Sequence, residues 1–170
     1  KDLFAFFKSV APSSYAPPEN EMGFPFNQRA LMGIWNALFF DSERYVVDDS
    51  QSEQWNRGAY LVEGLAHCGT CHTPRNALGG KEDDRALSGG TYNDRVAEDK
   101  IRSWSAVNLT SAPDGLDAWS AEDIAAYLKT GHSSMAGSFG PMNEVITLST
   151  SQLSDDDIQA MAEYLDSLPP

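Results

Sequence analysis

The chain is poor in cysteine, in basic residues and in long apolar runs. Its 170 residues include two cysteines, and 12 Lys and Arg stand against 25 Asp and Glu, which gives a formal net charge of −13. This acidic balance disfavours binding to a polyphosphate backbone or to an anionic membrane surface. No apolar run approaches the roughly 20 residues that a membrane-spanning helix needs. We therefore expect no nucleic-acid partner and no transmembrane segment in this chain.

Apolar residues are nevertheless abundant, and they recur at helical spacing. The chain is 41% hydrophobic and 11% aromatic, which is enough to build a core of its own. The last two predicted helices begin after the N-cap serines Ser120 and Ser154, and the first of these two ends at Gly131. An N-cap at Asn27 is predicted for an earlier helix. The five predicted helices cover residues 2–10, 29–40, 55–68, 121–130 and 155–168.

The stretch from residue 73 to residue 117 lacks such periodicity. Glycine, asparagine and proline are frequent there, so we expect a long loop that wraps around something. Strand-like alternation is absent from the sequence apart from a short extended run at residues 45–47. The sequence therefore predicts an all-α fold with large loops.

The two cysteines stand in the segment HCGTCH, residues 67–72, which contains the pattern C-x-x-C-H. This pattern is the attachment sequence for c-type haem. Two thiols three residues apart on one helical turn can each add to one vinyl group of a porphyrin, and the histidine that follows then lies beneath the iron. We therefore predict one covalently attached haem c on Cys68 and Cys71, with His72 as its proximal ligand through Nε2.

Three other uses of the segment are weighed against haem. A redox dithiol of the thioredoxin type would be expected in a βαβ context, which the sequence does not show. A zinc site would need its four ligands within six residues, which is too tight for a closed tetrahedron; these ligands would be His67, Cys68, Cys71 and His72. A disulfide across so short a loop would stabilise the fold little. Haem attachment is the interpretation that fits the spacing best.

The ligand on the opposite face of the iron has to come from another methionine or histidine. Met161 lies on the apolar face of the last predicted helix, where core packing is expected. Met22 and Met32 precede the attachment helix in a predicted linker, and His67 is adjacent to Cys68 and cannot readily reach the far face. The full set of candidates is Met22, Met32, Met135, Met142, Met161, His67 and His132.

A flexible stretch at residues 131–144 is the expected source of this sixth ligand. Met142 ranks first, because it follows a rigid Gly-Pro turn that can direct its thioether inward. Met135, among small residues, His132 and an open sixth position remain as alternatives. Histidine and methionine together would raise the potential of the iron and close it to substrates, which indicates electron transfer.

Other residues have less specific roles. Arg75 could pair with a haem propionate or could be a solvated surface residue. Trp104, Asn108 and Trp119 lie in the wrapping loop, where they could donate to the propionates or close the pocket. Tyr60 and Tyr164 are expected to pack where the first and last helices of the haem unit cross.

Several segments together resemble a known family. WNRGAYLVEGLAHCGTCHTPRNALGG, WSAVNLT, WSAEDIAAYLKTGH, GPMNEV and STSQLSDDDIQAMAEYLDSL are similar to segments of the multihaem cytochrome c subunits of membrane-bound periplasmic dehydrogenases. Those subunits accompany alcohol, gluconate, aldehyde and sugar dehydrogenases in proteobacteria and acetic acid bacteria. The resemblance implies a class I cytochrome c fold with long haem-wrapping loops, and haem ligation by His72 and Met142.

The resemblance also suggests a modular organisation. The family's subunits carry three haem modules, whereas this sequence contains one C-x-x-C-H. Residues 6–12 parallel residues 164–170, so residues 1–12 are expected to be the tail of a preceding module, in a fragment or a shortened relative. We expect residues 1–50 to hold this tail helix and an inter-module linker with one helix, and residues 51–170 to form the haem-binding domain.

The resulting functional hypothesis is a periplasmic electron carrier, not an enzyme. It would relay electrons from the catalytic subunit of a dehydrogenase to quinone or an oxidase, and any association with a membrane would run through its partners. The acidic surface would suit a partner with a basic docking patch, although it could equally serve solubility. The alternative is a haem enzyme or sensor whose open or His-ligated sixth position binds peroxide or a gas.

Overall fold

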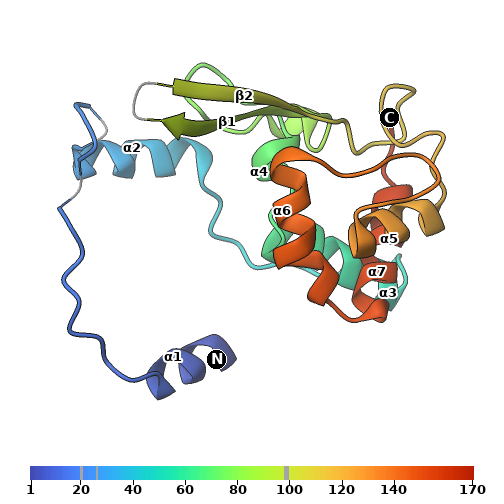
Figure 1. The fold of residues 1–170 in the computed structure, drawn as a ribbon, viewed down its shortest axis with the longest axis horizontal. Coiled ribbons are helices and arrows are strands. Elements are labelled where there is room, and N and C mark those ends of the chain that lie inside the picture. The colour runs from blue at the N-terminus through green and yellow to red at the C-terminus, as the bar shows by residue number, and fades with distance from the viewer. Residues whose placement is uncertain (20, 26, 98–99) are drawn as a thin grey trace. The chain divides into compact units, whose positions relative to one another are not determined.

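The computed structural model describes residues 1–19, 21–25, 27–97 and 100–170 (Figure 1). The chain divides into two compact units, Lys1–Asp41 and Ser42–Pro170. The first unit contains α1 (Asp2–Ser9) and α2 (Arg29–Phe39), close to their predicted positions. The predicted cap at Asn27 is wrong, because Gln28 holds the N-cap position and no side chain caps the helix.

The second unit carries the C-x-x-C-H segment and is built mainly of short helices. In chain order its elements are α3 (Glu53–Ala59), the π-helical turn η1 (Tyr60–Leu65), α4 (Gly69–His72), the 3-10 turn η2 (Asp83–Arg85), β1 (Gly90–Ala97), β2 (Lys100–Ala106), α5 (Ala121–Thr130), α6 (Gly140–Leu148), the 3-10 turn η3 (Thr150–Gln152) and α7 (Asp155–Asp166).

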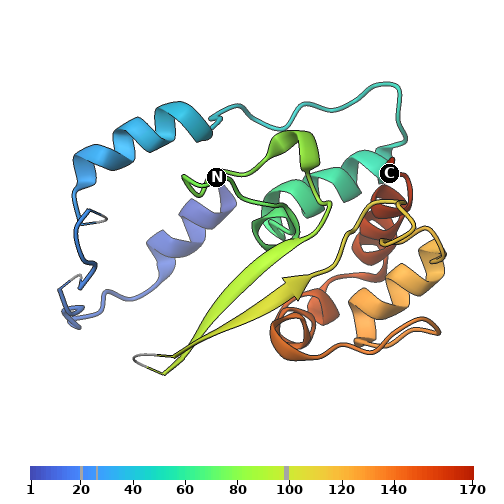
Figure 2. The same cartoon turned by 90° about the horizontal axis from the view of Figure 1, so that it is seen from above.

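The predicted all-α fold is wrong, because an antiparallel hairpin occupies much of the predicted wrapping loop. Strand β1 pairs with β2, and Tyr92 lies opposite Trp104 in the register. Figure 2 shows the hairpin extending away from the helices of this unit. Most side chains of both strands are exposed, so neither strand has one face packed against a core. The sequence therefore lacks the alternation by which a half-buried strand is recognised.

The core of the second unit lies among α3, η1, α5 and α7. Val62 and Met161 have no exposed surface, which confirms Met161 as a core residue. Tyr164 is also buried, and its ring packs edge-on against that of Trp55 with centroids 5.0 Å apart. Tyr60, in contrast, is 38% exposed and its ring contacts Tyr45.

Helices α3 and α7 approach each other closely at a glycine. A Cβ atom on Gly58 would meet the backbone carbonyl of Ala160, so no larger residue fits there without moving a helix. The Arg57 guanidinium binds the Asp157 carboxylate through two contacts of 2.7 and 3.1 Å. Trp55 Nε1 donates to Ser167 Oγ at 2.6 Å. These contacts fix the helix that leads toward the cysteines.

Three predicted helix boundaries are confirmed. Ser120 and Asp123 form a reciprocal capping box at the start of α5. Gly131 ends that helix in the left-handed conformation, with φ of 79°, which glycine adopts without steric cost. Ser154 caps α7 by accepting a hydrogen bond from the backbone N–H of Asp157.

Helix α6 was not predicted. The sequence was interpreted there as a flexible stretch, but the helix begins at Gly140 and Pro141 lies in its first turn. Proline fits that position because its fixed φ is helical and its missing N–H would have had no partner. Ile146 is 1% exposed and anchors the helix in the unit.

Candidate functional site

Helix α3 and the turn η1 deliver the C-x-x-C-H segment. Widened π-type turns occur often at functional sites, and here the Ala66 N–H donates to the Leu61 carbonyl at 2.8 Å. The Cys68 N–H donates to the Val62 carbonyl at 3.1 Å, so the first cysteine is tied to the buried end of this helix. The single turn α4 then places Cys71 and His72 directly after it.

The two cysteines lie on this turn without a disulfide between them. Cys68 packs against the core, and burial raises the pKa of its thiol to about 11. Burial also raises the pKa of Cys71, while the charge of Arg75 lowers it by a smaller amount. The backbone N–H groups of Cys71 and His72 both donate to the Cys68 carbonyl, at 3.2 and 3.0 Å, which fixes the three residues on one turn.

The imidazole of His72 is oriented by a backbone carbonyl. Its Nδ1 lies 2.7 Å from the carbonyl oxygen of Val107, which can only accept, so Nδ1 carries the proton. Burial lowers the pKa of His72, which favours the neutral ring. In this tautomer Nε2 has a free lone pair, as a metal ligand requires. Sequence reasoning missed Val107, because a backbone carbonyl leaves no signal in residue identity.

The candidates for the sixth ligand differ in their surroundings. Met142 lies in the first turn of α6, is half-buried and packs against the same core as Cys68. Met135 is 44% exposed. The exposed His132 has its Nδ1 3.3 Å from the carbonyl oxygen of Thr130. Of these three candidates, Met142 is the one held against the core of the unit.

Trp104 brings a buried polar atom to this region. Its indole Nε1 is buried and has no hydrogen-bond partner among the residues that the structure describes. The Arg102 guanidinium lies 5.5 Å from its ring centroid, and the Phe139 ring lies 6.3 Å away. A buried donor without a partner is costly. A carboxylate from a bound group would satisfy it.

Arg75 and Asn108 make hydrogen bonds within the loops. The Arg75 guanidinium donates to the carbonyls of Gly79 and Thr70, at 2.8 and 3.2 Å. The Asn108 amide donates to Asp114 at 3.0 Å, and its oxygen accepts from the backbone N–H of Thr110 at 2.9 Å. Both side chains therefore hold the loops in shape.

Trp119 has a packing role. It is partly buried against the core of the second unit. Its ring packs edge-on against Tyr127 of α5, with centroids 5.6 Å apart. The indole thus closes the end of the loop onto the helix that follows it.

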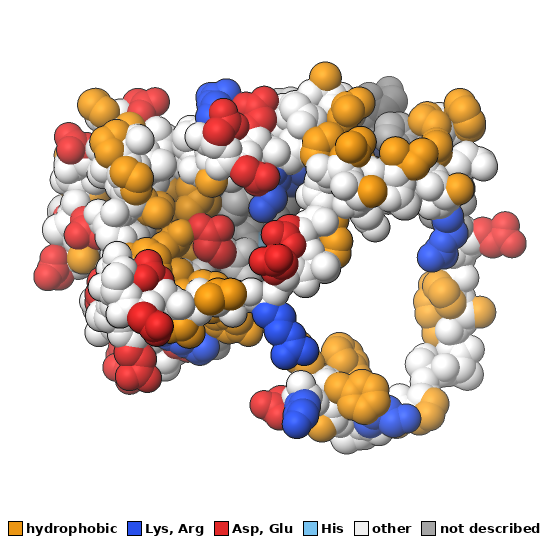
Figure 3. All heavy atoms as spheres, turned by 180° about the vertical axis from the view of Figure 1, so that it is seen from behind, with side chains coloured by type: hydrophobic (Ala, Val, Ile, Leu, Met, Phe, Trp, Pro, Cys, Tyr) orange, Lys and Arg blue, Asp and Glu red, His pale blue; other side chains and the backbone are white. Residues whose placement is uncertain are grey.

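Large apolar side chains are exposed on the segments that carry these residues. Val107 is 61% exposed and Phe139 is 74% exposed. Leu65, Leu78 and Val145 are exposed as well. Figure 3 shows apolar side chains on the surface of the molecule between acidic ones. Val107 and Phe139 thus bring exposed apolar surface to His72 and Trp104. Such surface is typical of a site that binds a large apolar group, and the flat porphyrin of a haem has this character.

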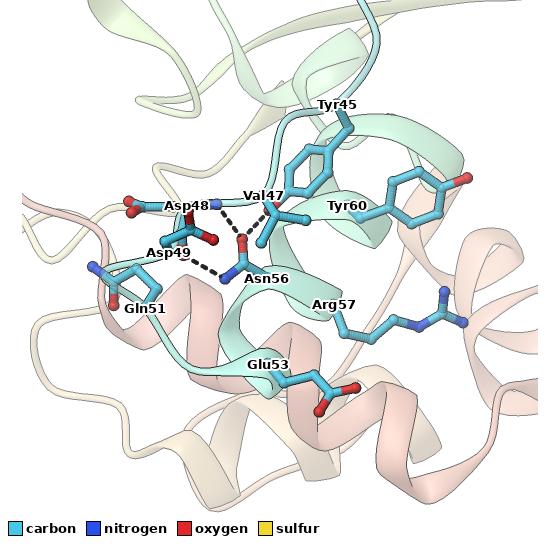
Figure 4. Close-up of a pocket in the computed structure, with 9 residues that line it drawn as sticks. All are labelled: Tyr45, Val47, Asp48, Asp49, Gln51, Glu53, Asn56, Arg57 and Tyr60. Atoms are coloured by element: carbon cyan, nitrogen blue, oxygen red, sulfur yellow. Dashed lines mark hydrogen bonds between the residues drawn. The ribbon is translucent and has the colours of Figure 1, made fainter.

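An open pocket of about 500 Å³ lies beside α3, apart from the cysteines. In Figure 4 the Asn56 amide holds the preceding segment: its oxygen accepts from the Tyr45 hydroxyl and from the Asp48 N–H, each at 2.8 Å, and its nitrogen donates to the Asp48 carbonyl at 2.9 Å. The pocket is lined by Tyr45, Val47, Asp48, Asp49, Gln51, Glu53, Asn56, Arg57 and Tyr60.

Comparison with known proteins identifies the family. Residues 56–169 match the family model described as cytochrome c. The chain belongs to the cytochrome c family. This confirms the predicted resemblance, and membership of this family implies a covalently attached haem c.

Curated relatives of this cytochrome c include subunits of dehydrogenases. The chain is 42% identical, over 99% of its length, to the fructose dehydrogenase cytochrome subunit of Gluconobacter japonicus, of which it covers 34%. It is 37% identical over 99% of its length to the gluconate 2-dehydrogenase cytochrome c subunit of Pantoea cypripedii, and covers 38% of it. It is 40% identical over 99% of its length to a diheme cytochrome c-type protein of Cereibacter sphaeroides, and covers 53% of it.

The cytochrome c chain thus spans between about a third and about half of the length of these relatives. The match to each of them includes the residues before position 56, where the family model begins. In the part of the chain that the structure describes, no helix combines the length and the apolar character that crossing a bilayer demands.

Proposed function

We propose that this cytochrome c holds one haem, with His72 and Met142 as the axial ligands of its iron. The observation that carries the proposal is the arrangement of the C-x-x-C-H turn, in which the Val107 carbonyl binds Nδ1 of His72 and leaves Nε2 free. Cys68 and Cys71 would hold the haem covalently: each thiol would add across one vinyl double bond, with the sulfur on one carbon and the proton on the other. No oxidant is consumed.

The haem, when bound, supplies one-electron chemistry between ferric and ferrous iron. The protein's own residues set the conditions for it. Val107 fixes the tautomer and the orientation of His72, which strengthens the imidazole as a ligand. Met142 would be the second protein ligand of the iron, and its thioether would exclude substrates and raise the potential.

Three side chains are proposed to bind the carboxylates of the haem. The unpartnered Nε1 of Trp104 is the strongest of these donors, because burial penalises it unless an acceptor reaches it. Arg75 and Asn108 would use the N–H groups that remain beyond their bonds within the loops.

We place the haem-binding domain at residues 51–170 and a tail helix and linker at residues 1–50. The family model supports this division, since its match begins at residue 56. The Asn56 amide holds the end of this linker, at Asp48, against the start of α3.

The proposed role is electron transfer from the catalytic subunit of a dehydrogenase to quinone or an oxidase. The relatives named as cytochrome subunits of dehydrogenases support this role. Covalent attachment of haem is completed outside the cytoplasm, so we place the protein in the periplasm. Its net charge of −13 would speed its encounter with a basic surface on a partner.

Substitution of the sixth ligand tests this proposal. Met142→Ala is expected to abolish the weak long-wavelength band that sulfur ligation gives a ferric haem, whereas Met135→Ala should retain it. The opposite result would contradict the assignment of Met142.

Carbon monoxide separates an electron carrier from a haem enzyme or sensor. The ferrous wild-type protein is expected not to bind the gas, because Met142 occupies the iron, while Met142→Ala binds it readily. Fast gas binding by the wild-type protein would refute the electron-carrier role and support the alternative with an open sixth position.

A further inference from the structure

The β-hairpin connects the two sides of the proposed haem site. Resting on the ligand assignment above, we propose that Trp104, on the hairpin that also supports His72, is the positioning residue for Met142. The element that makes the fold depart from an all-α architecture thereby has a function at the site.

Both ends of the hairpin are attached to the C-x-x-C-H turn. Val107 follows β2 directly, and its carbonyl accepts the hydrogen bond from His72. On the other side, the N–H of Gly89, which precedes β1, donates to the His72 carbonyl at 2.9 Å. A Cβ on Gly90 would meet the carbonyl oxygens of Cys71 and Thr73, so the first residue of β1 lies directly on this turn. A shift of the hairpin would therefore move the support of His72.

Trp104 carries the contact to the opposite ligand. Its six-membered ring lies so close to Gly140 that a Cβ there would meet three ring atoms. Gly140 has φ of 58°, in the left-handed region that favours glycine, and it is the first residue of α6. Met142 follows two residues later. The indole thus fixes the point at which the chain turns into the helix that presents the methionine.

The burial pattern of β2 supports this role. Trp104 is half-buried, whereas Ile101, Ser103 and Ser105 on the same strand are exposed. The Phe139 ring, which precedes α6, adds a second contact to the indole. The contact of Trp104 with Gly140 is separate from the hydrogen bond of His72 to Val107. Loss of the indole should therefore loosen Met142 and leave His72 in place.

Competition by imidazole measures how firmly the methionine is held. Exogenous imidazole binds ferric iron only when the sulfur has left, so its apparent affinity rises with the released fraction. In the haem-loaded protein we expect Trp104→Ala to bind imidazole about tenfold more tightly than the wild type, with a weaker sulfur band. Trp104→Phe keeps a ring against Gly140 and loses the indole N–H, so it should change the affinity less than Trp104→Ala.

Ile101→Ala is the matched control, because Ile101 lies on the same strand and is 63% exposed. It should leave both readouts unchanged. If Trp104→Ala loses its haem, Trp104→Leu replaces it, with a smaller expected gain in imidazole affinity. Unchanged affinity in the folded, haem-loaded alanine or leucine variant would overturn the proposal.

Two further outcomes separate the possible failures. Equal effects of Trp104→Phe and Trp104→Ala would assign the role to the indole N–H and would overturn positioning by the ring. If Met142→Ala instead leaves the wild-type spectrum unchanged, the ligand assignment itself fails. Thermal melting and haem content of each variant distinguish release of the methionine from general loss of structure.

Discussion

Replacing Gly58 by alanine tests the helix crossing that supports the haem site. In an open helix position, glycine to alanine stabilises a protein by about 0.4–1 kcal/mol, because alanine loses less backbone entropy on folding. At Gly58 the added Cβ would meet the backbone carbonyl of Ala160 and the Cβ of Tyr164. Neither group is the flexible end of a side chain, so relief requires α3 and α7 to separate.

The expected cost follows from what the separation disturbs. Overpacking against a rigid neighbour costs typically about 1–3 kcal/mol. Here it also strains the ring contact between Trp55 and Tyr164 and the ion pair of Arg57 with Asp157. We therefore expect a net loss of about 3 kcal/mol, which at this size lowers the melting temperature by roughly 10 °C.

Gly64→Ala provides the control, because a Cβ at Gly64 meets nothing within 4 Å. Both variants are measured as haem-loaded protein by circular dichroism during urea and thermal unfolding. Gly64→Ala should match or exceed the stability of the wild type, while Gly58→Ala falls below it. Equal stabilities of the two variants would refute the close approach of α3 to α7.

Two further predictions concern the start of the second unit and its dependence on pH. Asn56→Ala should lower the free energy of unfolding, measured in urea, by about 2–4 kcal/mol, because it removes several hydrogen bonds of the Asn56 amide. Tyr45→Phe removes one of these bonds and should cost about 1 kcal/mol. Equal losses in the two variants would contradict the role of the amide. The Arg57 hydrogen bond lowers the pKa of Asp157 below its ordinary 3.8, so the pair stabilises the fold fully above that pH and loses its contribution as the pH falls through the lower folded value. The stability difference between the wild type and Asp157→Asn should be about 0.2–1 kcal/mol at neutral pH and should vanish in acid; a constant difference would contradict this.

Much of the helical framework could be predicted from local signals. Ser120, Gly131 and Ser154 mark helix ends through capping chemistry that depends on a few neighbouring residues, and all three are confirmed. The family could also be recognised, because C-x-x-C-H is a short continuous motif and its neighbouring segments match those of the relatives.

The elements that the sequence did not predict depend on contacts between distant residues. The hairpin has no apolar face, and its position rests on backbone bonds such as that of Gly89 to His72. Val107 acts through a carbonyl, which every residue has. The contact of Trp104 with Gly140 joins residues 36 positions apart, and neither residue alone indicates it.

The intact mass of the purified protein is the sharpest test of covalent haem attachment at Cys68 and Cys71. We expect the denatured chain to exceed its sequence mass by one haem, and the double variant Cys68→Ala with Cys71→Ala to retain no covalent haem. A denatured wild-type chain at its bare sequence mass, after maturation in cells that attach haem c to other proteins, would show that these cysteines hold no covalent haem.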